Sequence, residues 1–336
     1  MTTDSLLSEF LERFRSIYTV LDDALYASTL ESFSSPKPLT FWVNPLKSEI
    51  GFSDRVLSEK LQVECLRVAG FPWTYKVHNE HRKAVVHSDL FAQGRIYAQN
   101  LSSMLAAIEL NPAPGDRLLD LAAAPGGKAI LMASLMNNRG SIAAVEAVTK
   151  RYHKLKKQLA QYGVTIAKTF LGDGRFVGRK TPGQFDRVLL DAPCSSEARF
   201  RINDPETWQH WSENKIKESA RKQKGLIISA YKCLKPGGTL IYCTCSFAPE
   251  ENEAVIQHLI KTVGENFVEI KKIDYDRSVT TTQYPQLRGL MCVSGLIRWR
   301  SKTFHPDLVN ACRILPSTSS DGLFLCKLKK VNPQSS

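Results

Sequence analysis

The feature that most constrains the fold of this chain is a regular alternation of strand-like and helix-like segments from residue 116 onwards. Short apolar runs are expected as strands and longer amphipathic runs as helices. The strands are predicted near residues 116–122, 140–148, 165–173, 185–193 and 237–246, and the helices near 125–136, 149–163, 215–234 and 251–264. Further short strands are expected near 267–271 and 322–329. Strands that alternate with helices predict an α/β protein with a doubly wound parallel sheet.

The first 90 residues show a less regular pattern, which predicts a smaller α+β module. An amphipathic helix is expected near the start, followed by a strand at 39–47, a helix at 53–69 and strand-like segments at 75–77 and 83–86. A chain of 336 residues is long enough for a full α/β core and such an added unit. The predicted parts are an N-terminal module at 1–90, a main domain at 91–330 and a short tail at 331–336.

The N-terminus and the eight cysteines bear on the compartment in which the chain works. Acidic residues come early and no basic stretch precedes an apolar core, so a signal peptide is not expected. No apolar run approaches the roughly 20 residues that a membrane span needs. We therefore expect a cytoplasmic, reducing location and free thiols. Because no C-x-x-C pair occurs, no metal site is expected.

The net charge of +12 bears on the choice of partner. Lys and Arg gather in four clusters, at 150–157, 175–180, 199–201 and 215–224. A solvated helix face explains each cluster taken singly. The excess over the whole chain instead favours a polyanionic partner, because neutralised phosphates supply affinity without sequence preference. Nucleic acid is the partner of this kind that we expect.

Two cysteines follow two different predicted strands. Cys194 lies in VLLDAPCSS and Cys245 in GGTLIYCTCSF, each where an apolar run gives way to small polar residues. If these strands are neighbours in a parallel sheet, both thiols emerge at the carboxyl edge, where open α/β sheets bind ligands. Two thiols at one edge are able to form a disulfide, to bind a metal, or to act as nucleophile and partner on one substrate.

A glycine turn and three acids are predicted at the same edge. Gly126 and Gly127 join a strand to a helix, where a ligand approaches the backbone closely and helix amides point at it. Glu146 ends the next strand, about 20 residues on, where Rossmann-like folds place an acid on ribose hydroxyls. Asp173 and Asp191 end the two strands after it. A plain tight turn and surface charges explain single members, but the series predicts an adenosine-type pocket.

These motifs together resemble those of a known family. DLAAAPGGK, GDGR, DAPCSS and CTCSF, in this order, closely resemble the Sun (NSUN-type, NOL/NOP/Sun) family of RNA 5-methylcytosine methyltransferases. TFWVNPLK at 40–47 is similar to the family's N-terminal signature, and IYAQNLSSM to its entry motif. The segment 312–330 is similar to its closing strands, so the resemblance runs from about residue 40 to 330.

The resemblance implies a class I (Rossmann-like) methyltransferase fold with an RRM-like N-terminal module. It implies an enzyme that methylates rRNA or tRNA, with Cys245 as the nucleophile and Cys194 as the thiol that assists product release. The implied cofactor is S-adenosylmethionine, held by Ala122, Ala123, Ala124, Pro125, Gly126, Gly127, Lys128, Glu146, Asp173 and Asp191.

The chain departs from the usual family pattern at a few positions. Ala122 replaces a common Cys and Glu146 a common Asp, changes that keep the backbone contacts and the carboxylate chemistry. Ser196-Glu197 stands in place of a common Ser-Gly, and Phe247 in place of a frequent Thr. These two departures bear on the identity of the target and not on the type of reaction.

Methylation at C5 of cytosine explains why such a site needs two thiols and an acid. C5 is a poor nucleophile, and addition of a thiolate at C6 makes it enamine-like. A positive environment favours the thiolate, and besides the cofactor's sulfonium Lys128 is one candidate for it. Asp191 is expected to hold the N3/N4 edge of the base. Cys194 is expected to assist the elimination that frees the product.

The remaining cysteines and aromatic residues receive a structural interpretation. Cys243 shares a strand face with Cys245 and is expected as a buried core thiol. The same interpretation covers Cys65, Cys233, Cys292, Cys312 and Cys326. Arg199, Arg201, Trp208 and Trp211 follow the DAPC motif, where they line the RNA path or, for the tryptophans, pack in the core.

The expected substrate is single-stranded or loop RNA, because bases outside a duplex are accessible to chemistry. We expect the protein to bind it as a monomer.

Three other functions are alternatives to RNA methylation. A non-catalytic RNA-binding or ribosome-assembly factor on a methyltransferase scaffold is disfavoured by the intact Cys194, Cys245 and Asp191. A DNA cytosine-5 methyltransferase is disfavoured by the separate TCS cysteine and the N-terminal module. A redox dithiol protein leaves the predicted adenosine pocket unexplained.

Overall fold

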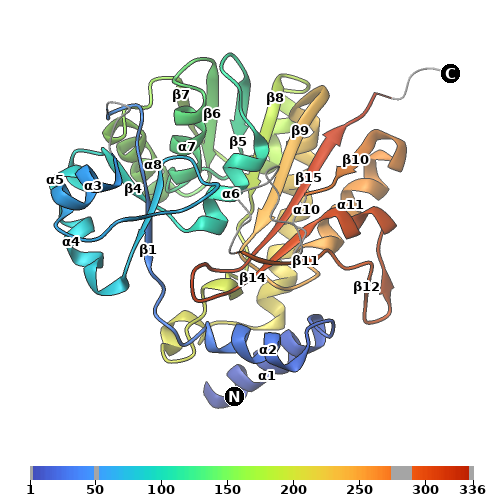
Figure 1. Ribbon diagram of the computed structural model, residues 1–336. Helices are drawn as coiled ribbons and strands as arrows, with labels where there is room; N and C mark the ends of the chain where they lie inside the picture. Colours follow the sequence, from blue (N-terminus) through green and yellow to red (C-terminus); the bar gives the residue numbers. More distant parts are fainter. Residues whose placement is uncertain (1–2, 49–52, 274–289, 333–336) are drawn as a thin grey trace.

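The computed structural model of the chain describes residues 3–48, 53–273 and 290–332 (Figure 1). Of the predicted tail, residues 333–336 lie outside the described residues. The described strands form a large sheet, a small four-stranded sheet and a two-stranded pair, β12 (Arg298–Trp299) with β13 (Lys302–Thr303). The large sheet, which carries the candidate site, occupies the centre of the molecule, and the small sheet lies to one side of it (Figure 1).

Five neighbouring strands of the large sheet are parallel, as the alternating pattern predicts. They are β5 (Arg117–Asp120), β6 (Ser141–Glu146), β7 (Ala167–Leu171), β8 (Phe185–Asp191) and β9 (Leu234–Thr244). Their order in space is β9-β8-β5-β6-β7. The chain order reverses between β8 and β5, and such a reversal places a ligand crevice at the carboxyl ends of the strands.

The other half of the large sheet is antiparallel, so the doubly wound sheet is mixed and the predicted parallel strands form one half of it. β15 (Leu323–Lys330) pairs antiparallel with β9, and β10 (Val268–Lys271) and β14 (Cys312–Leu315) pair with β15, while β11 (Met291–Ser294) pairs with β14. Antiparallel neighbours need only a short connection, whereas each parallel neighbour requires a crossover. The short segment 316–322 is therefore enough to bring β15 back beside β14.

Helices cover both faces of the large sheet, because side chains alternate along each strand. Leu118 and Leu189 face a core formed with the first set of helices, while Leu119 and Val188 face a second core on the opposite side. The first set is α6 (Leu101–Leu110), α7 (Gly127–Leu135) and α8 (Thr149–Gln161). The second set is α10 (Glu213–Cys233) and α11 (Glu253–Val263), with the short α9 (Val177–Lys180) packed against α10.

The small sheet is formed by four antiparallel strands in the order β2-β3-β1-β4. The strands are β1 (Leu39–Val43), β2 (Leu66–Arg67), β3 (Thr74–Val77) and β4 (Ile96–Ala98), and the helices between them are α3 (Asp54–Leu61), α4 (Arg82–Val86) and α5 (Asp89–Ala92). In chain order this is a β-α-β-β-α-β arrangement, or split βαβ. The RRM-like character of the module, in the sense of RNA binding, stays a prediction.

Two local predictions in this region are wrong. The segment 83–86 lies in helix α4 and not in a strand, because a short apolar run does not distinguish the two structures. Val85 is buried in the core and Val86 packs partly against it. The helix predicted for 53–69 ends at Leu61, where Gln62 adopts a left-handed conformation with φ 54°. The chain then turns into β2.

The first two helices pack against the core of the large sheet. Phe10 of α1 (Thr3–Ile17) contacts Trp211 at 5.8 Å between ring centroids, and Phe14 contacts Phe247 at 5.0 Å. α2 (Asp23–Glu31) continues beside α1, and both lie below the large sheet in Figure 1. The predicted domain limits at residues 90 and 330 are not tested by these contacts and remain predictions. Within the described parts of the chain, none of the helices has the length and apolar character needed to span a bilayer.

Candidate active site

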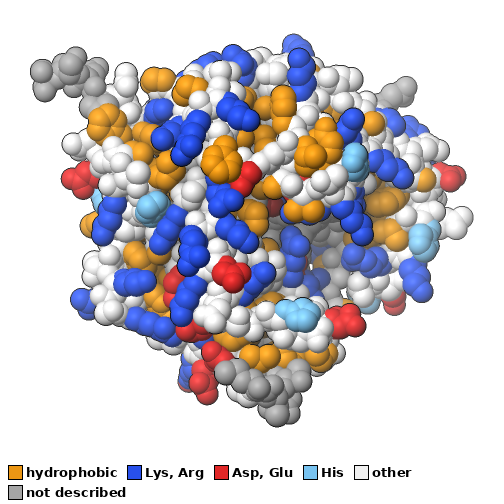
Figure 2. Space-filling view, turned by 180° about the vertical axis from the view of Figure 1, so that it is seen from behind, with side chains coloured by type: hydrophobic (Ala, Val, Ile, Leu, Met, Phe, Trp, Pro, Cys, Tyr) orange, Lys and Arg blue, Asp and Glu red, His pale blue; other side chains and the backbone are white. Residues whose placement is uncertain are grey.

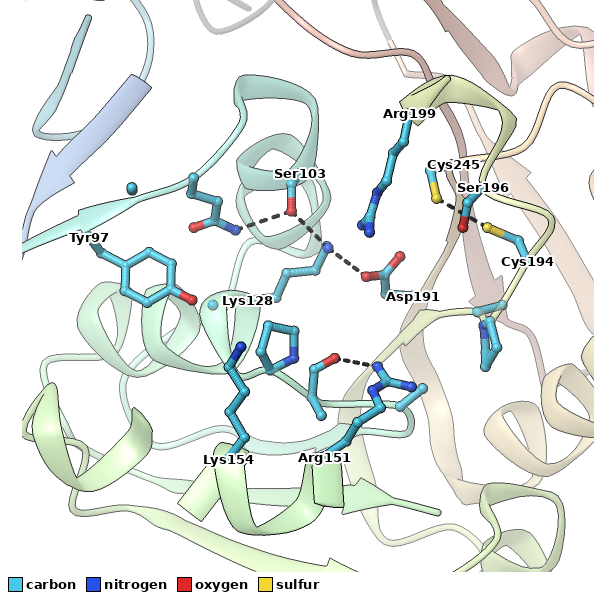
Figure 3. Close-up of a pocket in the computed structure, with 18 residues that line it drawn as sticks. Tyr97, Ser103, Lys128, Arg151, Lys154, Asp191, Cys194, Ser196, Arg199 and Cys245 are labelled. Atoms are coloured by element: carbon cyan, nitrogen blue, oxygen red, sulfur yellow. Dashed lines mark hydrogen bonds and ion pairs between the residues drawn. The ribbon is translucent and has the colours of Figure 1, made fainter. Parts of the chain in front are cut away.

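A cavity of about 600 Å³ opens at the carboxyl ends of β5, β8 and β9 (Figure 3). Most residues that the sequence assigned to the site line it, namely Ala122, Ala124, Pro125, Gly127, Lys128, Asp191, Cys194 and Cys245. The predicted convergence of the glycine turn with both cysteines is therefore observed. Several lining residues were not predicted from the sequence, among them Tyr97, Gln99, Ser103, Arg151 and Lys154.

The glycine turn forms one wall of the cavity, between the end of β5 and the start of α7. A Cβ on Gly127 would lie 2.8 Å from the hydroxyl oxygen of Tyr97, so no side chain fits there. Gly126 adopts φ 119°, a left-handed conformation that favours glycine. Ala123, which does not line the cavity, donates its N–H to the carbonyl of Val145 at 2.8 Å and anchors the turn to β6.

Glu146 lies buried at the end of β6 and is not among the residues that line the cavity, so its predicted contact with the cofactor stays a prediction. Its side chain is 3% exposed, and one carboxylate oxygen accepts the N–H of Val148 at 2.9 Å. The other oxygen is buried and has no hydrogen-bond partner among the described residues, although Arg151 approaches to 3.6 Å. An unpartnered buried carboxylate oxygen is costly unless a donor such as a hydroxyl completes it. The arrangement fits the ribose-binding role predicted from the sequence.

Asp173 is not brought into the cavity. Arg175 binds its carboxylate at 2.6 Å, and the hydrogen bonds from Arg175 lower the pKa of Asp173. Asp173 instead borders an apolar groove beside β6 and β7.

Asp120, at the end of β5, is an acid that was not predicted as a site residue. Burial raises its pKa to about 7, and the charge of nearby Asp191 acts in the same direction. Its position in LLDLA, just before the glycine turn, is the sequence signal by which Asp120 could have been found.

Lys128 and Asp191 form an ion pair at the bottom of the cavity. The ammonium nitrogen lies 2.6 Å from a carboxylate oxygen of Asp191 and 2.8 Å from the hydroxyl of Ser103 (Figure 3). Burial by itself would lower the pKa of Lys128, but the charge of Asp191 reverses this and holds the pKa above its usual value. Cys243, buried as predicted, donates its thiol to the other oxygen of Asp191 at 3.5 Å.

The two cysteine sulfurs lie 3.2 Å apart (Figure 3). β8 and β9 are parallel neighbours in which Asp191 is opposite Cys243, so the loops that follow the two strands leave the sheet side by side. The hydrogen bond from Cys194 lowers the pKa of Cys245 to about 7, and Arg199 contributes in the same direction. The same hydrogen bond, together with burial, raises the pKa of Cys194. These opposite pKa shifts favour Cys245 as the thiolate of the pair and Cys194 as the thiol.

A local Lys or Arg was expected beside the thiolate, with Lys128 as one candidate. In the structure the Lys128 ammonium pairs with Asp191. Arg199 takes the position beside Cys245, and its own pKa is raised by the charge of Cys245.

Trp208 and Trp211 are each 5% exposed and lie in the core, in agreement with the core interpretation.

Lys and Arg side chains surround a hollow on one face of the molecule, as Figure 2 shows. Arg151 and Lys154 of α8, from the basic cluster at 150–157, line the cavity itself. Arg199 brings a third cation from the opposite wall. An anionic substrate entering the cavity therefore meets positive charge on both sides.

Comparison with known sequences identifies similar proteins over most of the chain. The family model described as 16S rRNA methyltransferase RsmB/F matches residues 107–329. The tRNA (cytosine(49)-C(5))-methyltransferase of Pyrococcus abyssi is 33% identical, over 96% of this chain and 99% of that protein. The 28S rRNA (cytosine(4447)-C(5))-methyltransferase of Homo sapiens is also 33% identical, over 91% of this chain but only 36% of that protein.

Comparison with solved structures gives the same result. The crystal structure of a methyltransferase homolog from Pyrococcus horikoshii superposes with a TM-score of 0.74, at 28% identity and over 98% of each chain. The predicted class I methyltransferase fold is thereby confirmed. Ribosomal RNA small subunit methyltransferase F of Vibrio campbellii is 37% identical over 76% of this chain, which spans 53% of that protein. The chain thus corresponds to nearly the whole of the archaeal relatives and to a part of the longer ones.

Proposed function

We propose that this chain, which belongs to the RsmB/F (Sun-type) family of methyltransferases, transfers a methyl group from S-adenosylmethionine to C5 of a cytosine in rRNA or tRNA. The observation that carries the proposal is the pair of sulfurs 3.2 Å apart beside the Lys128–Asp191 ion pair. This reaction needs a thiolate beside a thiol, and an acid that binds the N3/N4 edge of cytosine. The cavity brings these groups together.

The glycine turn and Glu146 fit the cofactor that the family implies. Gly127 lines the cavity at the start of α7, where helix N–H groups favour an approaching ligand. The oxygen of Glu146 that makes no hydrogen bond offers an acceptor for a ribose hydroxyl. Ala122, Ala124, Pro125, Lys128 and Asp191 line the remaining wall, and Ala123 and Gly126 belong to the same turn without lining the cavity. When bound, S-adenosylmethionine supplies the methyl group and a positively charged sulfur. The assignment of Asp173 to the cofactor rests on the family resemblance, since Arg175 binds its carboxylate.

The remaining steps follow from the residues in the cavity. The Cys245 thiolate adds to C6 of cytosine, which makes C5 the nucleophilic carbon. Asp191, held by Lys128, accepts hydrogen bonds from the N3/N4 edge and stabilises the protonated ring. After methylation, solvent water takes up the C5 proton, the C5–H electron pair restores the C5–C6 double bond, and the S–C6 bond breaks with its electron pair returning to Cys245. Cys194 is placed to donate its proton to that sulfur.

The RNA is proposed to reach the cavity in single-stranded form across a basic surface. Arg151, Lys154 and Arg199 stand at the mouth of the cavity. The split βαβ module, assigned with residues 1–90, is proposed as a further RNA contact of the catalytic domain at 91–330. We also propose that the enzyme acts as a monomer without a metal ion, in the cytoplasm, where its thiols stay reduced.

The proposal is tested by methyl transfer in vitro. Purified protein is incubated with methyl-labelled S-adenosylmethionine and, separately, with unmodified tRNA and small-subunit and large-subunit rRNA. Label in 5-methylcytosine after nuclease digestion, located by bisulfite sequencing, is the expected result. Label in another nucleoside, or none in any RNA despite binding of the cofactor, would contradict the proposal.

A further inference from the structure

A buried carboxylate behind the cavity contacts both cysteine loops. Glu251 lies between β9 and α11 and is 0% exposed. Its carboxylate accepts hydrogen bonds from the N–H of Ser195 at 3.0 Å and from the Ser195 hydroxyl. It also accepts the hydroxyl of Ser246 at 2.8 Å. Since Ser195 follows Cys194 and Ser246 follows Cys245, one side chain connects the two loops.

The position of this carboxylate is fixed from α10 and β9 as well. Gln223 of α10 donates its side-chain N–H groups to Glu251 and to the carbonyl of Pro193, each at 2.8 Å. The hydroxyl of Tyr242 in β9 donates to the backbone carbonyl of Glu251 at 2.5 Å. These hydrogen bonds restrict the carboxylate to one arrangement, although the side-chain oxygen of Gln223 has no hydrogen-bond partner among the described residues. The distance between the two loops is therefore set by groups that do not contact substrate.

A second carboxylate faces Glu251 from the Cys194 loop. Glu197 is 1% exposed and accepts a hydrogen bond from Trp211 at 2.8 Å. The Ser246 hydroxyl lies 3.0 Å from Glu197 and 2.8 Å from Glu251, and its one proton is shared between the two carboxylates. Glu197 also accepts the N–H groups that follow Ser246, at 2.7 and 3.0 Å. Burial, together with the charge of Glu197, raises the pKa of Glu251 to about 7. Ionisation of Glu251 therefore takes place near neutral pH.

The charges around the two sulfurs are unequal. The pKa of Cys194 is raised first by its hydrogen bond to Cys245 and by burial, and the negative charge of Glu251 adds to this. The pKa of Cys245 is lowered by its hydrogen bond to Cys194 and by the guanidinium of Arg199, which together outweigh burial and the negative charge of Asp191. A negative charge near one sulfur and a positive charge near the other direct the shared proton to Cys194.

We propose that Glu251 is a positioning residue for the methyl transfer: it ties the Cys194 loop to the Cys245 loop and, through its charge, keeps the shared proton on Cys194. The different roles of two chemically identical thiols then depend on a residue outside the cavity. The catalytic role of Glu251 rests on the proposed function, whereas the position of the shared proton does not. The proton distribution itself is measurable without RNA or cofactor.

The test measures ionisation of Cys194 in a Cys245→Ser background. The rate of Cys194 alkylation by iodoacetamide is followed against pH by peptide mass spectrometry, with and without Glu251→Gln. The exchange removes the charge at constant size, and we expect the pH midpoint of alkylation to fall by ~1 unit. Glu250→Gln is the matched control, because the neighbouring Glu250 pairs with Arg13 at 2.6 Å and does not contact the cysteine loops. An equal midpoint in both variants, each with a native circular dichroism spectrum, would overturn the proposal.

A second variant tests whether the hydrogen bond between the Cys194 loop and Glu251 matters for catalysis. It remains informative if Glu251→Gln does not fold. Ser195→Ala removes one donor to Glu251 but leaves the carboxylate and its charge. We expect an unchanged Cys194 midpoint in the Cys245→Ser background, a several-fold lower kcat in the otherwise native enzyme and an unchanged KM for RNA. An unaltered kcat would show that the hydrogen bond from the Ser195 hydroxyl to Glu251 does not position the Cys194 loop for catalysis. A shifted midpoint in Glu251→Gln from a protein that methylates no RNA would instead refute the proposed function and leave the proton assignment standing.

Discussion

The two walls of the cavity are built on different physical principles. The glycine turn between β5 and α7 has its shape because side chains are missing, as at Gly127 beneath the Tyr97 hydroxyl, and because backbone bonds hold it to β6. The opposite wall, with Cys194 and Cys245, is held by buried carboxylates, hydroxyls and a guanidinium. The first wall therefore depends on space and the second on charge. Substitutions in the two walls are expected to fail in different ways.

The largest effects are expected where the charged wall carries the chemistry. Cys245→Ala should abolish methyl transfer, because no thiolate is left to add to C6. Cys194→Ala should instead accumulate a covalent RNA–protein adduct, because the leaving sulfur loses its proton donor. Denaturing gels with labelled RNA measure both. An adduct that is retained in Cys245→Ala and lost in Cys194→Ala would reverse the two roles.

A large effect is also expected in the wall that depends on space. Gly127→Ala places a Cβ 2.8 Å from the Tyr97 hydroxyl, and relief of such a contact typically costs ~1–3 kcal/mol. We expect weaker cofactor binding by calorimetry, with the same pH dependence as the native protein. Gly172→Ala is the control, because its Cβ would meet no atom within 4 Å. Equal affinities in the two variants would show that the close approach of Tyr97 is unimportant.

A moderate, pH-dependent effect is expected from the cation beside the nucleophile. Because the pKa of Cys245 is lowered to about 7, the rate of adduct formation should rise with pH up to about 7 and level off above it. Arg199→Gln removes one cause of the lowered pKa, so the midpoint should move upward by ~1 unit and the rate at pH 7 should fall several-fold. Arg201→Gln, whose guanidinium pairs with Asp321 at 2.9 Å, should leave the midpoint in place. An unmoved midpoint in Arg199→Gln would remove the arginine from this role.

The smallest effect is expected at Glu146. Glu146→Gln keeps one acceptor oxygen but loses the charge, so affinity for the cofactor should fall by only ~0.5–1 kcal/mol, in the lower range for a hydrogen bond. Calorimetric titration measures it, with the exposed residue Glu269 of β10, changed to Gln, as control. Unchanged affinity would argue against the ribose-binding role.

The contrast between the walls also explains what the sequence could predict. Periodicity and the motifs predicted the parallel strands, the glycine turn and both cysteines, because each depends on local sequence. Arg199 and Glu251 act through contacts made only when separate loops meet, and no local pattern signals such contacts. The antiparallel position of β15 beside β9 is likewise a tertiary choice. The helix at 83–86 was missed because four apolar and basic residues fit a strand equally well.

The packing of α1 against Phe247 has a practical consequence for work on this protein. Phe14 contacts the ring of Phe247, and that ring lies two positions beyond Cys245. A truncation that removes the first helix would therefore loosen the loop of the nucleophile. Loss of activity after such a truncation would not measure RNA recognition. Point changes on the exposed face of the small sheet are the cleaner way to separate substrate capture from turnover.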